Sequence, residues 1–399
     1  MQLPLRVQYR LIQVRITARQ WRLLRRAYAV ARYYIPRLIS YATVPILGER
    51  AALRGYHERT RDLLCSSDEP HTEPAQHSAT LPFVHFDEAD PKLFVAEIPR
   101  GRSLYSCGAI VAPDHKLLAD VSWQTFALDP NKPSPLYHFA MRKLYLPKVH
   151  YIRGSAAVLA SVQPNNYYHW MFDILPRFGI LRRSGLTPDY YIVNTDASFQ
   201  RESLNLLNIP STKIVNPTAH RHIQADNLIV PSLPGPIFGT TMQAQPCEFL
   251  RSSFLAPGDK KAPHRLLYIS RSDAKTRRLI NEPEVLDMIV PLGFDVLTLA
   301  GMSFAKQVEL FSQARVAIGP HGAGLSNVVF CWPGAVLIEI LPKGRSVDCF
   351  EKVAGIVGLD YRAIASEVHP APGKPCDTDD HYVDIAELGR MVHRVLGTC

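Results

Sequence analysis

Short apolar runs alternate with amphipathic segments in the second half of the chain, and this alternation predicts strands followed by helices. The predicted strands are 266–269, 294–299, 316–318 and 336–341, and the predicted helices are 283–290, 304–314 and 324–330. Strands that alternate with helices form right-handed βαβ units around a parallel sheet. We therefore expect such a sheet over 264–370, closed by an amphipathic helix at 385–396 within the C-terminal segment 380–399.

The first half contains similar segments in a less regular order. Strand-like runs lie at 109–111, 156–162, 190–193 and 228–230. A polar, proline-punctuated segment at 65–82 precedes them, and 256–264 is rich in the residues that mark linkers. The pattern predicts a first domain of strands and helices over 83–257, joined by a hinge to the second domain over 264–370.

A glycine-rich turn follows the apolar run 316–318, and it predicts an anion site. Its sequence is Gly-Pro-His-Gly-Ala-Gly-Leu-Ser-Asn over 319–327. Glycines let the backbone approach a phosphate closely, and the N–H groups of the first helical turn point at it. The predicted contacts come from His321, Gly322, Ala323 and Gly324. Asn327 either binds a ligand or satisfies the backbone of the loop.

Four cations follow the strand at 266–269 and complete the predicted pocket. They are Arg271, Lys275, Arg277 and Arg278. Arginine donates two parallel hydrogen bonds from a planar fork, which fits the oxygens of a phosphate. The alternative is a basic turn that is merely exposed to solvent.

Ligands of parallel sheets bind at the carboxyl ends of the strands. Arg271, Gly301, His321 and Glu339 all fall at or just beyond such ends. One strand end is followed by the amides of the glycine turn and the other by the cations, and together they indicate a pocket for a nucleoside diphosphate. Glu339 is a candidate acceptor of hydrogen bonds from ribose hydroxyls. Asn281 is expected to cap the helix at 283–290, and Glu282 to stabilise its start.

The first domain carries a second candidate centre in Asn-Asn-Tyr-Tyr-His-Trp-Met-Phe-Asp-Ile-Leu-Pro-Arg over 165–177. On a helix, His169 and Asp173 share a face and can form a hydrogen bond. A neighbouring carboxylate orients a histidine ring and raises its basicity, which suits a general base that deprotonates a hydroxyl group. The alternative is a buried His–Asp pair that only stabilises a core helix.

The composition is that of a globular chain with a sizeable core, because 47% of its 399 residues are hydrophobic. No apolar run reaches 18 residues, and the N-terminus lacks the apolar stretch and cleavage site of a signal peptide. The seven cysteines are scattered, odd in number and without a CxxC pair. This usage predicts reduced thiols and a cytoplasmic protein.

The net charge of +9 is concentrated in a basic arm over 1–64, since residues 1–48 hold nine arginines and no acidic residue. Over 21–38 the apolar and arginine positions fall on opposite faces of a helix. Such a helix binds an anionic membrane surface through residues 1–60, or it packs on the protein body with its arginines in solvent. No nucleic-acid partner is expected, because no motif for one is present.

Several chemical motifs are absent. The chain has no GxxxxGK[ST] loop, no GxSxG turn, no HExxH and no paired CxxC, which argues against a P-loop NTPase, an esterase-type nucleophile and a zinc site. The one Asp-x-Asp, at 377–379, lies in a polar loop rather than at a strand end. We therefore expect no cofactor and no metal, with cationic side chains stabilising a diphosphate instead.

Together these motifs resemble glycosyltransferase family 61, including its bacterial members described as capsular polysaccharide biosynthesis proteins. The resemblance covers roughly 150–345 and rests on the segments 166–176, 268–271, 278–282 and 319–325. It implies an α/β chain of GT-B type, in which two Rossmann-like domains face a central cleft and the donor binds the C-terminal domain. It also implies inverting, metal-independent transfer from a nucleotide sugar.

The resemblance thus implies a hexosyl- or pentosyltransferase that moves a sugar from a nucleotide-sugar donor to a glycan or lipid-linked glycan during synthesis of capsule, exopolysaccharide or lipopolysaccharide. His169, oriented by Asp173, is the expected base, and Asn166 and Tyr168 are expected to line the acceptor side. The expected location is the cytoplasm, at the inner face of a bacterial plasma membrane. Two alternatives remain open: another GT-B-like nucleotide-sugar enzyme such as an epimerase, and a non-catalytic protein that binds glycans or nucleotide sugars.

Overall fold

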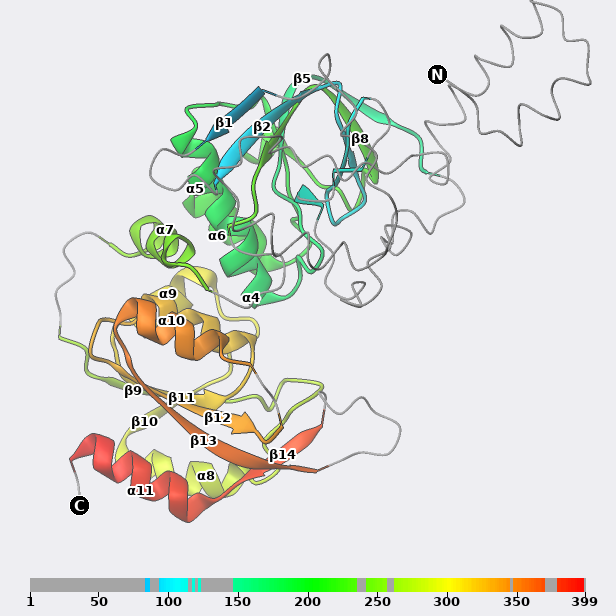
Figure 1. Cartoon of the computed structure of the whole chain (residues 1–399). Coiled ribbons are helices and arrows are strands. Elements are labelled where there is room, and N and C mark those ends of the chain that lie inside the picture. Colours follow the sequence, from blue (N-terminus) through cyan, green and yellow to red (C-terminus); the bar gives the residue numbers. More distant parts are fainter. Residues whose placement is uncertain are drawn as a thin grey trace, which may run out of the picture.

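The computed structural model describes residues 83–86, 93–113, 117–118, 121–122, 146–234, 242–256, 262–344, 347–369 and 379–397. The predicted basic arm over 1–64 and most of the predicted hinge lie outside these residues. The described residues form two sheets, one in each half of the chain, and each sheet has its own helices (Figure 1). None of the helices described has the length and apolar character needed to span a bilayer.

The first sheet combines antiparallel and parallel strands in the order β1-β2-β8-β5-β6-β7, with β3 pairing β8 and β4 pairing β3. Its strands are β1 (Phe83–Phe86), β2 (Phe94–Pro99), β3 (Arg102–Leu104), β4 (Ala109–Val111), β5 (His150–Val158), β6 (Tyr190–Ile192), β7 (Ile214–Val215) and β8 (His222–Pro231). A Rossmann-like sheet is parallel, but among the described strands of this sheet only the pairs β5–β6, β5–β8 and β6–β7 are parallel. β1 pairs antiparallel with β2, and β3 with β4, because connections this short cannot carry a parallel crossover. β2 and β3 also pair antiparallel with β8.

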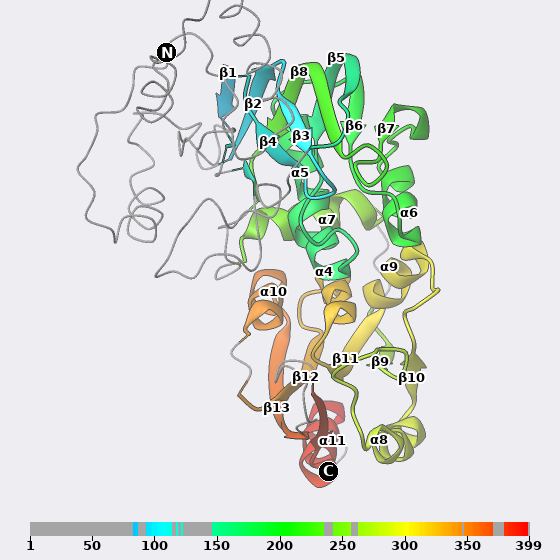
Figure 2. The same ribbon diagram turned by 90° about the vertical axis from the view of Figure 1, so that its right-hand side faces the viewer.

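The helices of the first half begin with a continuous segment that follows β5. This segment consists of α4 (Tyr167–His169), the π-helical η6 (Trp170–Ile174) and α5 (Leu175–Arg183). The other helices are α6 (Ser198–Leu206), η7 (Ser211–Lys213) and α7 (Ala244–Phe254). In both views this group of helices lies between the first sheet and the second half of the chain (Figures 1 and 2).

The second sheet has the order β10-β9-β11-β12-β13-β14 and is parallel except for β14, so the predicted parallel sheet is confirmed. Its strands are β9 (Arg265–Ile269), β10 (Phe294–Leu297), β11 (Ala314–Pro320), β12 (Val336–Pro342), β13 (Asp360–His369) and β14 (Asp380–Val383). Its helices are α8 (Glu282–Ile289), η8 (Val290–Leu292), α9 (Phe304–Ser312), η9 (Ala323–Phe330), α10 (Cys349–Val357) and α11 (Ile385–Leu396). The C-terminal segment 380–399 is therefore not helical throughout, because it opens with β14.

Helices cover both faces of the second sheet. α8 and α11 lie on one face, whereas α9 and α10 lie on the face toward the first half (Figures 1 and 2). Successive strand residues point to opposite faces, so Tyr268 belongs to the core under α8 and α11 while Leu267 and Ile269 belong to the other core. Burial on both faces explains why these strands read as continuous apolar runs.

One apolar core joins the two halves of the chain. It contains Trp170 and Phe172 from the first half together with Phe304 and Phe330 from the second, all at most 2% exposed. α7 packs against helices of both halves. Polar contacts reinforce this core, because Arg251 Nη1 donates to the carbonyls of Val329 and Cys331 at 2.7 and 2.5 Å. The mutual position of the two sheets is therefore set by close packing.

Tyr167 provides a buried hydrogen bond across the same boundary, and its removal gives a stability prediction. Tyr167 Oη donates to Asn327 Oδ1 at 2.7 Å. In the Tyr167→Phe variant the buried Oδ1 of Asn327 loses the donor that Tyr167 supplies. We therefore expect the free energy of unfolding to fall by about 1–3 kcal/mol. Urea unfolding measures the change, with Tyr382→Phe at an exposed site as the control. Equal stability of the two variants would show that the bond contributes nothing.

Candidate active site

His169 and Asp173 lie together at the start of the helical segment after β5. Asn166 caps this segment, since its side chain accepts a hydrogen bond from the Tyr168 amide at 3.0 Å. His169 Nδ1 lies 2.6 Å from Asp173 Oδ2, and the two side chains are 17% and 28% exposed. The contact places the proton of a neutral ring on Nδ1 and the lone pair on Nε2. The pair is accessible to a substrate.

A second histidine–carboxylate pair lies at the carboxyl end of the second sheet. His321 follows β11, and the parallel register places Glu339 of β12 beside Gly319. His321 Nδ1 lies 2.5 Å from Glu339 Oε1, and Tyr361 Oη donates to Glu339 Oε2 at 2.7 Å. Glu339 is 1% exposed, and its carboxylate holds the His321 ring. The ribose contact of Glu339 stays a prediction.

Aromatic rings connect the two pairs across the boundary between the sheets. The Tyr168 ring lies 5.5 Å from the His169 ring and 5.9 Å from the Phe350 ring, measured between centroids. Phe350 in turn lies 5.3 Å from His321. Burial, followed by the Cys349 thiol and the Asp173 carboxylate, raises the pKa of the Tyr168 hydroxyl, which therefore stays protonated. The sequence carried no signal for Phe350, because its place depends on how α10 packs.

The cationic loop and the glycine turn meet at Arg271 and Gly322. Arg271 donates from Nε to the Arg277 carbonyl at 3.1 Å and from Nη2 to the Thr276 carbonyl at 3.0 Å. A methyl group on Gly322 would lie 1.8 Å from Arg271 Nη1, so a side chain at this position would have to displace the guanidinium. Ala323 and Gly324 open η9, where the amides have no preceding helical carbonyl. A guanidinium and a helix start thus lie side by side.

The remaining cations of the loop have other positions. Lys275 is exposed, and Arg277 is half-buried with a φ of 56°. Arg278 forms an ion pair with Asp380 of β14, with Nη2 and Oδ2 2.9 Å apart, and its amide donates to Asp380 Oδ1 at 2.8 Å. Arg278 thus attaches the loop to β14 instead of lying beside Arg271 at the glycine turn. The sequence could not reveal this contact between residues 102 positions apart.

His381 of β14 lies beneath the same loop and was not predicted as part of the site. It is fully buried, and its amide donates to the Arg278 carbonyl at 3.0 Å. Burial lowers its pKa to about 4; the Arg277 carbonyl opposes this shift, while the charges of Arg271 and Arg277 add to it. His381 is therefore neutral at neutral pH.

Three further polar residues turn inward rather than toward a ligand. Asn281 makes no capping bond and pairs instead with the Val383 backbone, to which its Nδ2 donates at 2.9 Å. Glu282 accepts from Tyr268 Oη at 2.9 Å and Ser270 Oγ at 3.1 Å, which secures the end of β9. Asn327 is fully buried, and its Nδ2 donates to Gln307 Oε1 at 2.8 Å. Its Nδ2 also donates to the Gly324 carbonyl at 3.2 Å, which agrees with the alternative that Asn327 satisfies the backbone of the loop.

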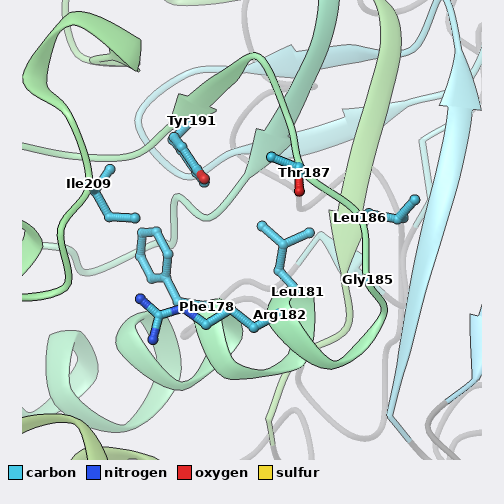
Figure 3. Close-up of a pocket in the computed structure, with 8 residues that line it drawn as sticks. All are labelled: Phe178, Leu181, Arg182, Gly185, Leu186, Thr187, Tyr191 and Ile209. Atoms are coloured by element: carbon cyan, nitrogen blue, oxygen red, sulfur yellow. The ribbon is translucent and has the colours of Figure 1, made fainter.

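A hollow on the surface of the first half lies apart from these residues. The hollow has a volume of about 190 Å³ and lies beside the end of α5. Arg182 and Tyr191 are among its lining side chains (Figure 3). Its lining includes none of the predicted site residues. Across the described part of the chain, no group of three or more His, Cys, Asp and Glu side chains is arranged to hold a metal ion.

A family of known proteins matches the segment that carries both histidines, and individual relatives match parts of the chain. Residues 167–338 match the family described as Glycosyltransferase 61. A beta-1,2-xylosyltransferase from Arabidopsis thaliana is 38% identical over 100 residues, which are 22% of this chain and 19% of that protein. An EGF domain-specific O-linked N-acetylglucosamine transferase from Drosophila melanogaster is 29% identical over 197 residues, 42% of this chain and 36% of that protein.

Other similarities are more limited. The alpha-1,3-arabinosyltransferase XAT3 from Oryza sativa subsp. japonica is 35% identical over 109 residues, 26% of this chain and 19% of that protein. The chain thus aligns with about a fifth of the length of the two plant relatives. The structure of the iron-containing heptosyltransferase TibC aligns with 82% of this chain and covers 98% of the TibC chain. Its TM-score is 0.31 and its sequence identity is 11%, so it carries no argument here. Residues 167–338 of this chain are thus similar to glycosyltransferase family 61.

Proposed function

We propose that the chain is an inverting glycosyltransferase that moves a sugar from a nucleotide-sugar donor to a hydroxyl group of a glycan. The observation that carries the proposal is the placement of His169–Asp173 and His321–Glu339 on opposite sides of one boundary, joined by Tyr168 and Phe350. The family match covers both histidines. In this arrangement the first half of the chain supplies the base, and the second half supplies hydrogen-bond donors to an anion.

His169 is the proposed base. Its Nε2 takes the proton of the acceptor hydroxyl while Asp173, at Nδ1, holds the ring and stabilises the imidazolium that forms. The acceptor oxygen bonds to the anomeric carbon as the bond from that carbon to the diphosphate oxygen breaks. A single displacement of this kind inverts the configuration and needs no nucleophile from the protein.

The leaving diphosphate is proposed to lie against Arg271 and the turn formed by His321, Gly322, Ala323 and Gly324. Arg271 brings a full positive charge to this turn, and the first amides of η9 add partial charge. Glu339 holds Nδ1 of His321, which leaves Nε2 on the outer edge of the ring. These groups stabilise the charge that develops on the diphosphate, so the proposed reaction requires no metal.

The setting of the reaction is part of the same proposal. The names of the relatives indicate transfer of xylose, arabinose or N-acetylglucosamine, so a pentose or an N-acetylhexosamine is the donor sugar that we propose to test first. The arginine-rich residues 1–60 support a cytoplasmic enzyme that works on a glycan at an anionic membrane surface, as in the synthesis of a surface polysaccharide.

A panel of nucleoside diphosphates and nucleotide sugars tests the proposal by thermal shift, in EDTA and then in magnesium. A ligand that binds the native state raises the melting temperature by mass action. We expect one nucleotide to stabilise the protein equally in both buffers. No stabilisation by any member would contradict a donor site, and a shift that needs magnesium would contradict the metal-free mechanism. Turnover of the donor without an acceptor would indicate an epimerase.

A further inference from the structure

The cationic loop between β9 and α8, which carries Arg271, lies against β14. Its residues 278–280 exchange backbone hydrogen bonds with His381, at 3.0 and 2.9 Å, as a short parallel strand would. The Asn281 side chain continues this pairing, because it donates to the Val383 carbonyl at 2.9 Å and accepts from the Val383 amide at 3.2 Å. The end of the loop is therefore fixed by a strand about a hundred positions later in the chain.

Asp380, at the start of β14, receives three hydrogen bonds from one residue of the loop. The Arg278 amide donates to Oδ1 at 2.8 Å, and Arg278 Nε and Nη2 donate to Oδ2 at 3.2 and 2.9 Å. An ion pair between two exposed side chains contributes little, because each gives up its freedom to hold the other. Here the same carboxylate also holds an amide, so Asp380 fixes the backbone of the loop and not only a side chain.

The next contacts lead from this fixed backbone to Arg271. The carbonyls of Thr276 and Arg277, the two residues immediately before Arg278, accept from Arg271 Nη2 and Nε at 3.0 and 3.1 Å. The remaining nitrogen, Nη1, lies at the glycine turn, where a methyl group on Gly322 would be 1.8 Å away. Two nitrogens of the guanidinium are thus held by the backbone of the loop, so a shift of this backbone moves the third.

We propose that Asp380 is a positioning residue for the donor: it holds the loop at Arg278 and thereby keeps Arg271 at the glycine turn, where the diphosphate binds. The inference rests on the proposed function, because it assigns Arg271 a phosphate to bind. Asp380 acts through Arg278 and Arg271. It also lies beyond residues 167–338, so the family match includes the cation but not the carboxylate that fixes its loop.

Positioning and simple electrostatics predict opposite results when the carboxylate is removed. Loss of a negative charge near a site for an anion by itself strengthens binding. Loss of the support for Arg271 weakens it. The sign of the change in affinity therefore separates a carboxylate that positions a cation from one that merely lies near the pocket.

The test is calorimetric binding of UDP and GDP to the full-length protein. Asp380→Ala is expected to raise the dissociation constant by about 3- to 10-fold, and Asp380→Asn by less, since its amide oxygen can still accept from the Arg278 amide. Asp360→Ala is the matched control. Asp360 Oδ2 accepts from Arg362 Nε and Nη2 at 3.2 and 2.7 Å, but it lies at the opposite end of β13 from the residues that pair with β14.

A double-mutant cycle separates positioning from general damage to the second half of the chain. If Asp380 acts through Arg271, then Asp380→Ala should change the dissociation constant by less than about 1.5-fold in the Arg271→Ala background. Equal weakening in both backgrounds would overturn the proposal. Unchanged or stronger binding in Asp380→Ala alone would overturn it as well. If Asp380→Ala does not fold, the same cycle with Asp380→Asn decides.

Hydrogen exchange in the absence of ligand provides a readout that does not depend on the proposed function. The Ile280 amide donates to the His381 carbonyl, a partner that Asp380→Ala leaves in place. Exchange at this amide should nevertheless become about 3- to 10-fold faster, because the loop before it is released. Unchanged exchange would overturn the positioning role whether or not a nucleotide binds. Faster exchange without binding of either nucleotide to the wild type would instead overturn the donor site, and the role of Asp380 in it.

Discussion

Replacing His169 with glutamine is expected to lower sugar transfer by about 100- to 10,000-fold, the usual contribution of a general base. Glutamine keeps much of the side-chain size but cannot take up a proton at Nε2. The affinity for the nucleotide donor should stay unchanged, because His169 belongs to the first half and the proposed diphosphate contacts belong to the second. Initial rates with saturating donor, together with calorimetric binding of the nucleoside diphosphate, measure the two quantities separately.

Two further variants make this result specific. Asp173→Asn should also reduce transfer, because an amide can donate to Nδ1 and so favour the tautomer with its proton on Nε2. His264→Gln changes an exposed histidine before β9 and should leave transfer unchanged. Wild-type rates in a folded His169→Gln would remove His169 from the mechanism. Loss of donor binding in the same variant would show that the two halves do not divide the roles as proposed.

Removing the guanidinium of Arg271 is expected to weaken binding of the nucleoside diphosphate by about 10- to 100-fold, since a hydrogen bond to a charged group contributes about 1.5–3 kcal/mol. In the Arg271→Ala variant the loop also loses the bonds to the Thr276 and Arg277 carbonyls. Isothermal calorimetry measures the dissociation constant, and repetition at higher salt tests whether the lost contact is ionic. An unchanged constant would exclude Arg271 from the pocket.

The same strand supplies a matched control for Arg271. Arg265 is the first residue of β9, so it lies at the end of this strand opposite to the one that Arg271 follows. It is paired with Asp295, and Arg265→Ala should therefore leave donor affinity unchanged. Gly322→Ala tests the same contact from the glycine turn, because its methyl group would displace Arg271 Nη1. It should weaken binding in the same direction as Arg271→Ala while adding little to that variant in the double mutant.

Contacts within a few residues of each other followed directly from the sequence. The pairing of His169 with Asp173 needs only helical spacing, and the helix at 385–396 needs only its apolar periodicity. The parallel sheet followed from alternating apolar runs and amphipathic segments. The family motifs pointed to glycosyltransferase family 61, and the family match over 167–338 confirms this.

Packing between distant segments decided the rest. Glu339 faces His321 and Tyr361, and Asn327 faces Tyr167 and Gln307, so both are buried where the sequence placed them near a ligand. Among the antiparallel strands, β4 was predicted from the apolar run 109–111, whereas β1, β2, β3 and β14 were not predicted from local patterns. Whether a polar side chain at a strand end turns inward depends on its neighbours from other strands and helices.

The sequence by itself therefore determined which segments carry the chemistry: a His–Asp pair on one helix, and a glycine turn and a cationic loop at two strand ends. Those properties arise from residue type and short spacing. Only the tertiary structure decided which of these groups face a common boundary, and that Arg278 is paired with Asp380. The reason is that strand register and side-chain packing join residues far apart in the chain. They therefore determine which polar side chains are buried and which charged groups are paired.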